Sequence, residues 1–256
     1  LFNALTGARQ HVGNYPGITV DKKEGDAVLG DLEVHITDLP GAYSLTSYTQ
    51  EELVARNVVL DEKPDVVIDV LNAAALERNL YLAVQFLELG APMVLALNMM
   101  DEVKAKGMTI DTAKLSELMG APVVETVARQ GVGKEAVLRE AGELARRRSG
   151  QWEPLNISYG PDLDPVLEDM ARLIEERGFL TRRYPAKWLA LKYMEGDEEI
   201  LDVGEKEGGP HQELLDMVEA VSEHCQKTLS TYPEALIADY RYGYIASLMK
   251  QGVVRK

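Results

Sequence analysis

The fold can be read from residues 64–102, which run PDVVIDVLNAAALERNLYLAVQFLELGAPMVLALNMMDE. Two continuous apolar runs, DVVIDVL (65–71) and PMVLALN (92–98), are typical of strands that are buried on both faces. Between them, LERNLYLAVQFLELG (76–90) has apolar residues at helical spacing and ends on a glycine, a residue favoured at helix ends. The segment therefore predicts a strand–helix–strand unit.

The residues upstream extend this pattern. Residues 20–30 and 32–38 predict two extended segments that a short Gly-Asp turn joins. The sequence TQEE (49–52) resembles a capping box, and it predicts a helix that runs to about residue 61. The two glutamates are candidate general bases, but their place in the box favours a structural role.

Downstream, a helix, a strand and a helix are predicted in turn, over residues 112–120, 121–126 and 133–148. Repeated strand–helix units predict an α/β fold with a doubly wound, mostly parallel sheet. Such a sheet binds its ligands at the carboxyl ends of the strands. We assign this domain to residues 1–149.

The pattern changes after residue 150. The remaining chain predicts helices without a convincing strand, over residues 162–178, 184–195, 211–230 and 233–251. We therefore expect a small all-α domain over residues 150–256.

Composition narrows the classes of function. The 42 acidic and 27 basic residues give a net charge of −15, which repels nucleic-acid phosphates, so we expect no binding to nucleic acid. The single cysteine, Cys225, excludes an internal disulfide framework. No apolar run reaches the roughly 18 residues of a membrane span. The four histidines share no ligand spacing and predict no metal site: His11, His35, His211 and His224.

Three polar motifs lie at or beside predicted strand ends, and the first is DLPG (38–41). The Asp38 carboxylate can hold a magnesium-bound water, and the backbone amide of Gly41 can approach a terminal phosphate closely. The same four residues also suit a plain turn.

The second motif, NMMD (98–101), ends the second buried strand. The carboxylate of Asp101 can accept hydrogen bonds from N1–H and N2–H₂ of guanine, while Asn98 can tie neighbouring loops together. An Asn/Asp turn at a strand end is the alternative reading.

The third motif is Thr19 in the Gly/Pro-rich loop GNYPGIT (13–19). A hydroxyl on such a loop can close on magnesium when a γ-phosphate is present. An ordinary exposed loop is the alternative. Taken together and in this order, the three motifs predict a GTP-binding domain that uses Mg²⁺.

Longer segments resemble one family. VGNYPGITVDKKEG (12–25), TDLPGAYSLTSYTQEE (37–52) and LERNLYLAVQFLELGAPMVLALNMMDE (76–102) are similar to the N-terminal cytosolic region of FeoB, the bacterial ferrous-iron transport protein B. The likeness continues through RYPAKWLALKYMEGDEE (183–199) and IADYRYGYI (237–245). It implies a GTPase domain and a helical domain like a nucleotide-dissociation inhibitor, both preceding an iron-conducting membrane part.

The resemblance implies roles for the motif residues. Thr19 and Asp38 become the magnesium ligands, and Thr19 and Gly41 become the residues that act on the γ-phosphate. The switch I segment would comprise Gly13, Asn14, Tyr15, Pro16, Gly17 and Thr19.

The base would be held by two segments, according to the same resemblance. Asn98, Met99 and Asp101 form the guanine-specificity motif, and residues 127–129 form the last guanine-contacting loop. The residues of that loop are Val127, Ala128 and Arg129. Family members usually have Ser-Ala where this chain has Val127-Ala128. The Ala128 backbone amide can still meet the guanine oxygen, but the missing Ser hydroxyl would loosen nucleotide binding.

Two further positions bear on the chemistry. Family members usually have Asp where this chain has Asn72, and we expect only a local effect. Ala42 follows Gly41 where many GTPases place a water-positioning Gln, a difference that the family shares. Hydrolysis would then depend on positioning and charge. Related GTPases use K⁺ held partly by the switch I backbone, which leaves K⁺ as a candidate second cofactor.

The resemblance also implies a wider setting. A phosphate loop, GxxxxGK[ST], would immediately precede the residues that match LFNAL (1–5), and membrane spans would follow residue 256. The partners would be GTP, GDP and the protein's own transmembrane Fe(II) permease region, with self-association left open. The module would lie on the cytoplasmic side of the bacterial inner membrane.

We therefore expect a GTPase module that couples nucleotide state to Fe(II) uptake. Two alternatives remain at this point: a regulatory module that binds nucleotide without turnover, and a GTPase associated with the ribosome or tRNA. The acidic charge argues against the last.

Overall fold

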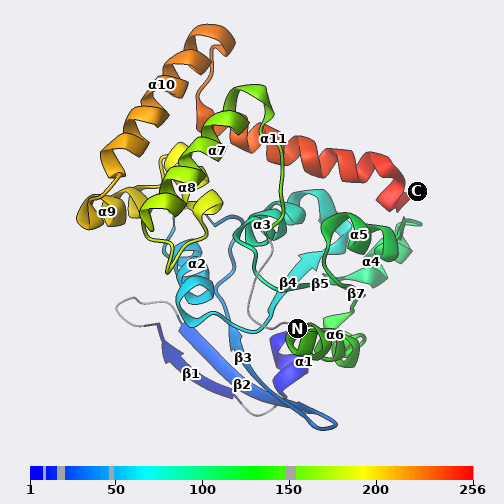
Figure 1. Ribbon diagram of the computed structural model, residues 1–256. Helices are drawn as coiled ribbons and strands as arrows, with labels where there is room; N and C mark the ends of the chain where they lie inside the picture. The colour runs from blue at the N-terminus through cyan, green and yellow to red at the C-terminus, as the bar shows by residue number, and fades with distance from the viewer. Residues whose placement is uncertain (8–9, 16–20, 46–48, 148–153, 256) are drawn as a thin grey trace. The chain divides into compact units, whose positions relative to one another are not determined.

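The computed structural model describes residues 1–7, 10–15, 21–45, 49–147 and 154–255 (Figure 1). The chain separates into two compact units. Leu1–Leu155 and Ile245–Lys256 form the first, which we call the sheet unit, and Asn156–Tyr244 form the second, the helical unit. The expected boundary near residue 150 stays a prediction.

An antiparallel sheet of three strands begins the sheet unit, in the order β1 (Gln10–Asn14), β2 (Asp21–Leu29) and β3 (Leu32–Asp38). The β2–β3 hairpin confirms the two predicted extended segments, and its register pairs Lys23 with Asp38. Strand β1 was not predicted, because its polar residues and Gly13 show no strand pattern and pairing with β2 determines its conformation.

A parallel sheet follows, with the order β4 (Val67–Asn72), β5 (Met93–Asn98) and β7 (Val123–Glu125). Helix α3 (Leu76–Leu89) joins β4 to β5 and ends at Gly90, whose φ of 84° only glycine adopts easily. The predicted strand–helix–strand unit is confirmed. Its register pairs Asn72 with Asn98, so both strands present an asparagine at the same edge.

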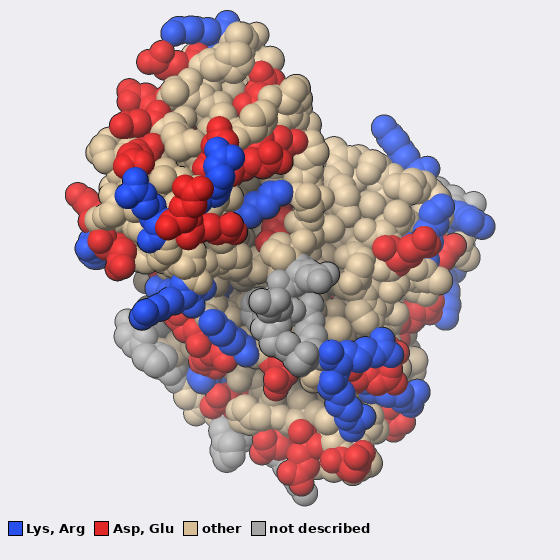
Figure 2. Space-filling view, in the orientation of Figure 1, with Lys and Arg blue, Asp and Glu red and all other residues tan. Residues whose placement is uncertain are grey.

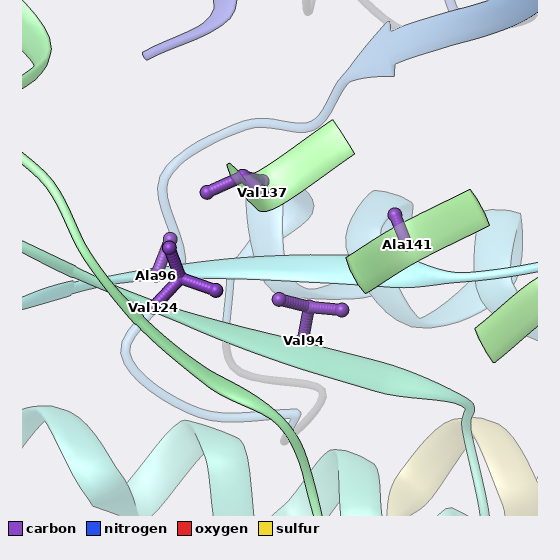
Figure 3. Close-up of a cluster of buried hydrophobic side chains, with 5 residues drawn as sticks. All are labelled: Val94, Ala96, Val124, Val137 and Ala141. Atoms are coloured by element: carbon purple, nitrogen blue, oxygen red, sulfur yellow. The ribbon is translucent and has the colours of Figure 1, made fainter. Parts of the chain in front are cut away.

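Helices cover both faces of the parallel sheet, as a doubly wound fold requires (Figure 1). On one face, Val137 and Ala141 of α6 (Lys134–Arg147) pack on Val94, Ala96 and Val124 (Figure 3). Successive strand residues face opposite sides, so Leu95 and Leu97 point to the other face, where α3 and α5 (Thr112–Met119) lie. All of these strand residues are buried, which explains the continuous apolar run of β5. Strand β4 differs from the prediction, because only one of its faces is fully buried: Val67, Asp69 and Leu71 are buried, whereas Val70 is 44% exposed.

Shorter elements complete the sheet unit. The Thr49 side chain accepts a hydrogen bond from the Glu52 amide at 3.2 Å, which caps α2 as the sequence predicted. The remaining elements are α1 (Phe2–Thr6), α2 (Gln50–Glu62), α4 (Met100–Ala105), β6 (Thr109–Ile110) and β8 (Val254–Arg255). Strands β6 and β8 pair antiparallel, so the last described residues return to the sheet unit.

The helical unit is built from α7 (Gly160–Arg177), α8 (Ala186–Met194), α9 (Glu198–Glu207), α10 (His211–Leu229) and most of α11 (Pro233–Leu248). The four predicted helices are confirmed, but α9 was missed because Gly204 interrupts its pattern. The glycine has a packing reason: a Cβ there would lie 1.9 Å from the Tyr193 hydroxyl. Within the described residues, no helix is long and apolar enough to cross a membrane.

A buried ion network joins α8 to α11 inside the helical unit. The Glu195 carboxylate accepts from Lys192 Nζ at 2.8 Å and also from Arg241 Nη1. Both cations are buried. Burial alone would raise the pKa of Glu195, but the two cations outweigh it and lower that pKa to about 2.

Candidate functional site

The candidate site lies at the carboxyl edge of the parallel sheet, where β5 and β7 end. Asn98, the last residue of β5, accepts a hydrogen bond from the Ala128 amide at 2.9 Å through its Oδ1 atom. The buried Thr126 hydroxyl lies 3.4 Å from the same oxygen. Asn98 therefore ties the loop after β7 to the end of β5, the role that its position predicted.

The turn after Asn98 presents Asp101. Met99 has a φ of 65°, in the left-handed region, and this sharp turn starts α4. The Met100 amide donates to the Thr126 carbonyl at 3.3 Å, which fixes the turn against the neighbouring loop. The Asp101 side chain then lies in the first turn of α4 and is 26% exposed, so it is accessible to a ligand.

The loop after β7 is held at both of its ends. Val127 and Val132 exchange backbone hydrogen bonds at 3.1 and 3.3 Å and close a short loop around Ala128. Gly133 follows with a φ of 85°, and a Cβ there would lie 2.3 Å from the Glu125 carbonyl oxygen. Only glycine allows such a close approach to the backbone. The loop that is closed in this way places the Arg129 side chain beside Asp101.

A second group of candidate residues surrounds the end of β3. Burial raises the pKa of the Asp38 carboxyl, and nearby Lys23 opposes that rise. The Tyr15 hydroxyl donates to the Asp38 backbone carbonyl at 3.0 Å. Gly41 is exposed, and apart from its chain neighbours none of the described residues comes within 4 Å of where its Cβ would be.

The predicted switch I segment is described only in part. Thr19, Pro16 and Gly17 lie outside the described residues. The expected loop does not begin at residue 13, because Gly13 and Asn14 belong to β1 and pair with β2. The assigned roles of all six residues stay predictions.

Asp38 has the chemistry that a magnesium site needs. A bound cation stabilises the charged form of a carboxylate that loses hydration on folding. Carboxylate and hydroxyl oxygens are also ligands that Mg²⁺ accepts. The described residues contain no group of three or more His, Cys, Asp or Glu side chains that could hold a metal by themselves. A magnesium ion held with help from a phosphate is compatible with both observations.

Two contacts of the site were not foreseen. Tyr15 is bonded to Asp38, and Arg129 is paired with Asp101. Each joins residues more than 20 positions apart, and no local sequence pattern indicates such a partner. Asn72, one of the departures from the family pattern, accepts from the Ala74 amide at 2.9 Å and so caps a short helical turn.

The geometry defines a class of protein: a doubly wound α/β domain with its polar loops at the carboxyl edge, where such folds bind nucleotides. The family model described as ferrous iron transport protein B matches residues 1–141, and the model of the FeoB cytosolic helical domain matches residues 159–254. The chain therefore belongs to the FeoB family of ferrous iron transport proteins.

Curated relatives agree with this assignment. The Fe(2+) transport protein A/Fe(2+) transporter FeoB fusion protein of Porphyromonas gingivalis is 39% identical over 257 residues, which cover 98% of this chain and 30% of the relative. The Fe(2+) transporter FeoB of Legionella pneumophila is 36% identical over 97% of this chain and 31% of its own length. The chain thus spans less than a third of either relative.

Solved structures share the whole fold. The cytosolic domain of the T. maritima FeoB iron transporter in apo form has a TM-score of 0.83 and 30% identity, covering 99% of this chain and 93% of that one. The cytosolic domain of L. pneumophila FeoB has a TM-score of 0.82 and 36% identity, covering 100% and 94%.

Proposed function

We propose that this chain is the cytosolic GTP-binding and GTP-hydrolysing part of a ferrous-iron membrane transporter. The observation that carries the proposal is the 2.9 Å hydrogen bond from the Ala128 amide to Asn98 Oδ1, which assembles the two loops of a base site next to Asp101. The T. maritima FeoB cytosolic domain, 30–31% identical to this chain, has been solved in GDP and GMPPNP forms.

The arrangement suits guanine. The Asp101 carboxylate offers two acceptor oxygens to N1–H and N2–H₂, and bonds to an ionised acceptor are strong. Adenine has neither of these donors in the corresponding positions. The loop after β7 would lie beside the guanine O6 atom. The Ala128 amide, which is the proposed donor to O6, donates to Asn98 Oδ1 in the structure and would have to exchange or share that acceptor when the base binds.

Hydrolysis is proposed to depend on charge and positioning. Asp38 and Thr19 would supply oxygen ligands to Mg²⁺, which neutralises phosphate charge when it is bound. The residue after Gly41 is Ala42, whose methyl group cannot orient a water, so backbone groups would have to do so. K⁺ is proposed as a second cation. Single-turnover hydrolysis in K⁺ and in Na⁺ tests both turnover and this cation, and a rate equal to that without protein would refute a GTPase.

The nucleotide state is proposed to control iron movement elsewhere in the protein. Both curated relatives are named as Fe(2+) transporters, and this chain matches less than a third of each. The helical unit would bias nucleotide affinity and pass the state to a membrane-embedded permease region. The module would work on the cytoplasmic side of the membrane.

Base specificity gives the sharpest test. In full-length protein, Asp101→Asn should weaken GTP binding at least about tenfold, because one acceptor becomes a donor facing a guanine donor. The same change should allow xanthosine triphosphate to bind, since xanthine has a carbonyl where guanine has its amino group. Glu102→Gln, which removes the neighbouring charge, is the control and should change neither affinity. Parental GTP affinity in Asp101→Asn would refute the guanine site.

A further inference from the structure

The proposed guanine acceptor already has a donor in the structure. The Arg129 guanidinium donates through Nη2 to Oδ2 of Asp101, and the two side chains form an ion pair. Arg129 is 74% exposed and Asp101 is 26% exposed, so the ion pair is accessible to solvent and can open. The oxygen that Arg129 occupies is one of the two that guanine needs.

The loop backbone holds Arg129 in reach of Asp101. The Ala128 amide, one residue before, is bonded to Asn98 Oδ1, and the exchange between Val127 and Val132 closes the loop. Asn98 also precedes the turn that carries Asp101. The same tie that would assemble the base site therefore also positions the arginine.

The two donors are chemically alike. A guanidinium presents parallel N–H groups in one plane, which match the two oxygens of a carboxylate. The donor edge of guanine, N1–H and N2–H₂ on a shared carbon, is itself a guanidine fragment. Arg129 can therefore offer Asp101 the kind of hydrogen bond that the base would offer.

We propose that Arg129 is an internal surrogate for guanine: it occupies Asp101 in the nucleotide-free protein and must leave when the base enters. This inference rests on the proposed guanine site and adds a regulation of it. The surrogate would give the Asp101 carboxylate a hydrogen-bond donor before the base binds, and it competes with incoming nucleotide. Because the pair is exposed, the competition is modest, and salt weakens it.

Kinetics of GDP binding to full-length protein test the competition. Arg129→Gln removes the cation, and it should raise the association rate of fluorescent GDP about two- to fivefold at low salt, the range that an exposed ion pair allows. The dissociation rate should not change, because Arg129 has already left Asp101 in the complex. The difference between variant and parent should shrink at about 1 M salt. Lys106→Gln removes another exposed cation, whereas the ion pair described for Asp101 is with Arg129, and it should not alter either rate.

The same measurements in the Asp101→Asn background separate the two proposals. If Asp101→Asn keeps parental GDP affinity, the guanine site itself is refuted. If Asp101→Asn weakens binding and Arg129→Gln changes nothing in the parent, only the surrogate is refuted. Faster dissociation in Arg129→Gln would also overturn it, because the arginine would then contact bound nucleotide. The inference predicts that Arg129→Gln has no effect once Asp101 is Asn.

Discussion

Tyr15 and Asp38 are joined by a hydrogen bond in which the Tyr15 hydroxyl donates to the Asp38 backbone carbonyl at 3.0 Å. Tyr15 is only 4% exposed. Burial, together with the acidic groups of Glu62 and Asp38, raises the pKa of this hydroxyl to about 12, so it remains a donor at any physiological pH. The bond connects the start of the predicted switch I segment to the predicted magnesium ligand.

Replacing Tyr15 with Phe should therefore lower stability. The change removes one hydrogen bond and leaves the ring in place, so the free energy of unfolding should fall by about 0.5–1.5 kcal/mol. Tyr43→Phe is the control, because Tyr43 is 76% exposed and its ring contact with Arg78 does not need the hydroxyl. Denaturant unfolding of both variants measures the difference. An equal loss in the two would show that the bond to Asp38 contributes nothing.

Asn98→Ala should loosen the loop after β7. The Ala128 amide loses its acceptor, which costs roughly 1–3 kcal/mol for a group that stays shielded from water. Hydrogen exchange at the Ala128 amide should accelerate, and guanine nucleotide affinity should fall with it. Gln130→Ala changes an exposed residue of the same loop and should leave all three quantities unaltered. Unchanged exchange at Ala128 in the Asn98 variant would contradict the assigned tie.

Asp69→Asn should change how stability depends on pH. Asp69 is buried in β4, its Oδ2 has no hydrogen-bond partner within the part of the chain that the structure describes, and burial raises its pKa from 3.8 to about 7. The folded state therefore keeps a proton that the unfolded chain releases near pH 4, so stability is lost as pH rises from about 4 to 7. The Asn variant should lack this loss and be the more stable protein at pH 8.

Urea unfolding at several pH values measures this effect. Asp65→Asn, at an exposed position of the same segment, is the control and should follow the parent curve. Parallel curves for parent and Asp69→Asn would show that the carboxyl is not protonated in the folded state.

Glu195→Gln should weaken the helical unit, with a pH dependence of the opposite direction. The folded pKa of about 2 lies below the ordinary value of 4.5, so the stabilisation is complete above about pH 4.5 and is lost as pH falls towards 2. At pH 7 the variant should be less stable by about 3–5 kcal/mol, because the buried cations lose their shared carboxylate. Glu205→Gln is the exposed control. The parent and Glu195→Gln curves should converge near pH 2, and a constant difference down to that pH would contradict the ion network.

The sequence predicted the positions of β4, α3 and β5 well, because apolar runs mark the strands and a helical repeat separates them. Burial on both sheet faces was predicted correctly for β5 but not for β4, where Val70 is 44% exposed. Strand β1 was missed, since it depends on pairing with β2 and not on its own residues. Helix α9 was missed because Gly204 was read as a break, whereas it makes room for the Tyr193 hydroxyl.

The candidate site divides in the same way. Asn98 and Asp101 could be placed from sequence, because a strand end fixes where they lie. The partner of Asp101 could not, because the position of Arg129 depends on a loop closed by Val127 and Val132. The contact between Arg129 and Asp101 depends on backbone geometry that residues far apart in the sequence determine. The polar residues around each of the two therefore form no sequence pattern that predicts it.

The distribution of charged side chains on the surface reflects the overall composition of the chain and no single local motif. On the face drawn in Figure 2, Asp and Glu side chains lie among Lys and Arg side chains over both units. The acidic side chains on that face are thus spread over many positions and do not form one patch. Such a distribution favours solubility of the module without creating a basic surface there.

The pairing of β8 with β6 makes the helical unit an insertion, entered after Leu155 and left again before Ile245. Two covalent connections therefore join the helical unit to the sheet unit. Cleavage of one connection would leave the helical unit attached through the other. A chain nicked between Leu155 and Asn156 would still be held through α11, by the β6–β8 ladder and by the bond from the Asp111 amide to the Val253 carbonyl at 2.8 Å. We therefore expect the two fragments to stay associated after limited proteolysis at this position.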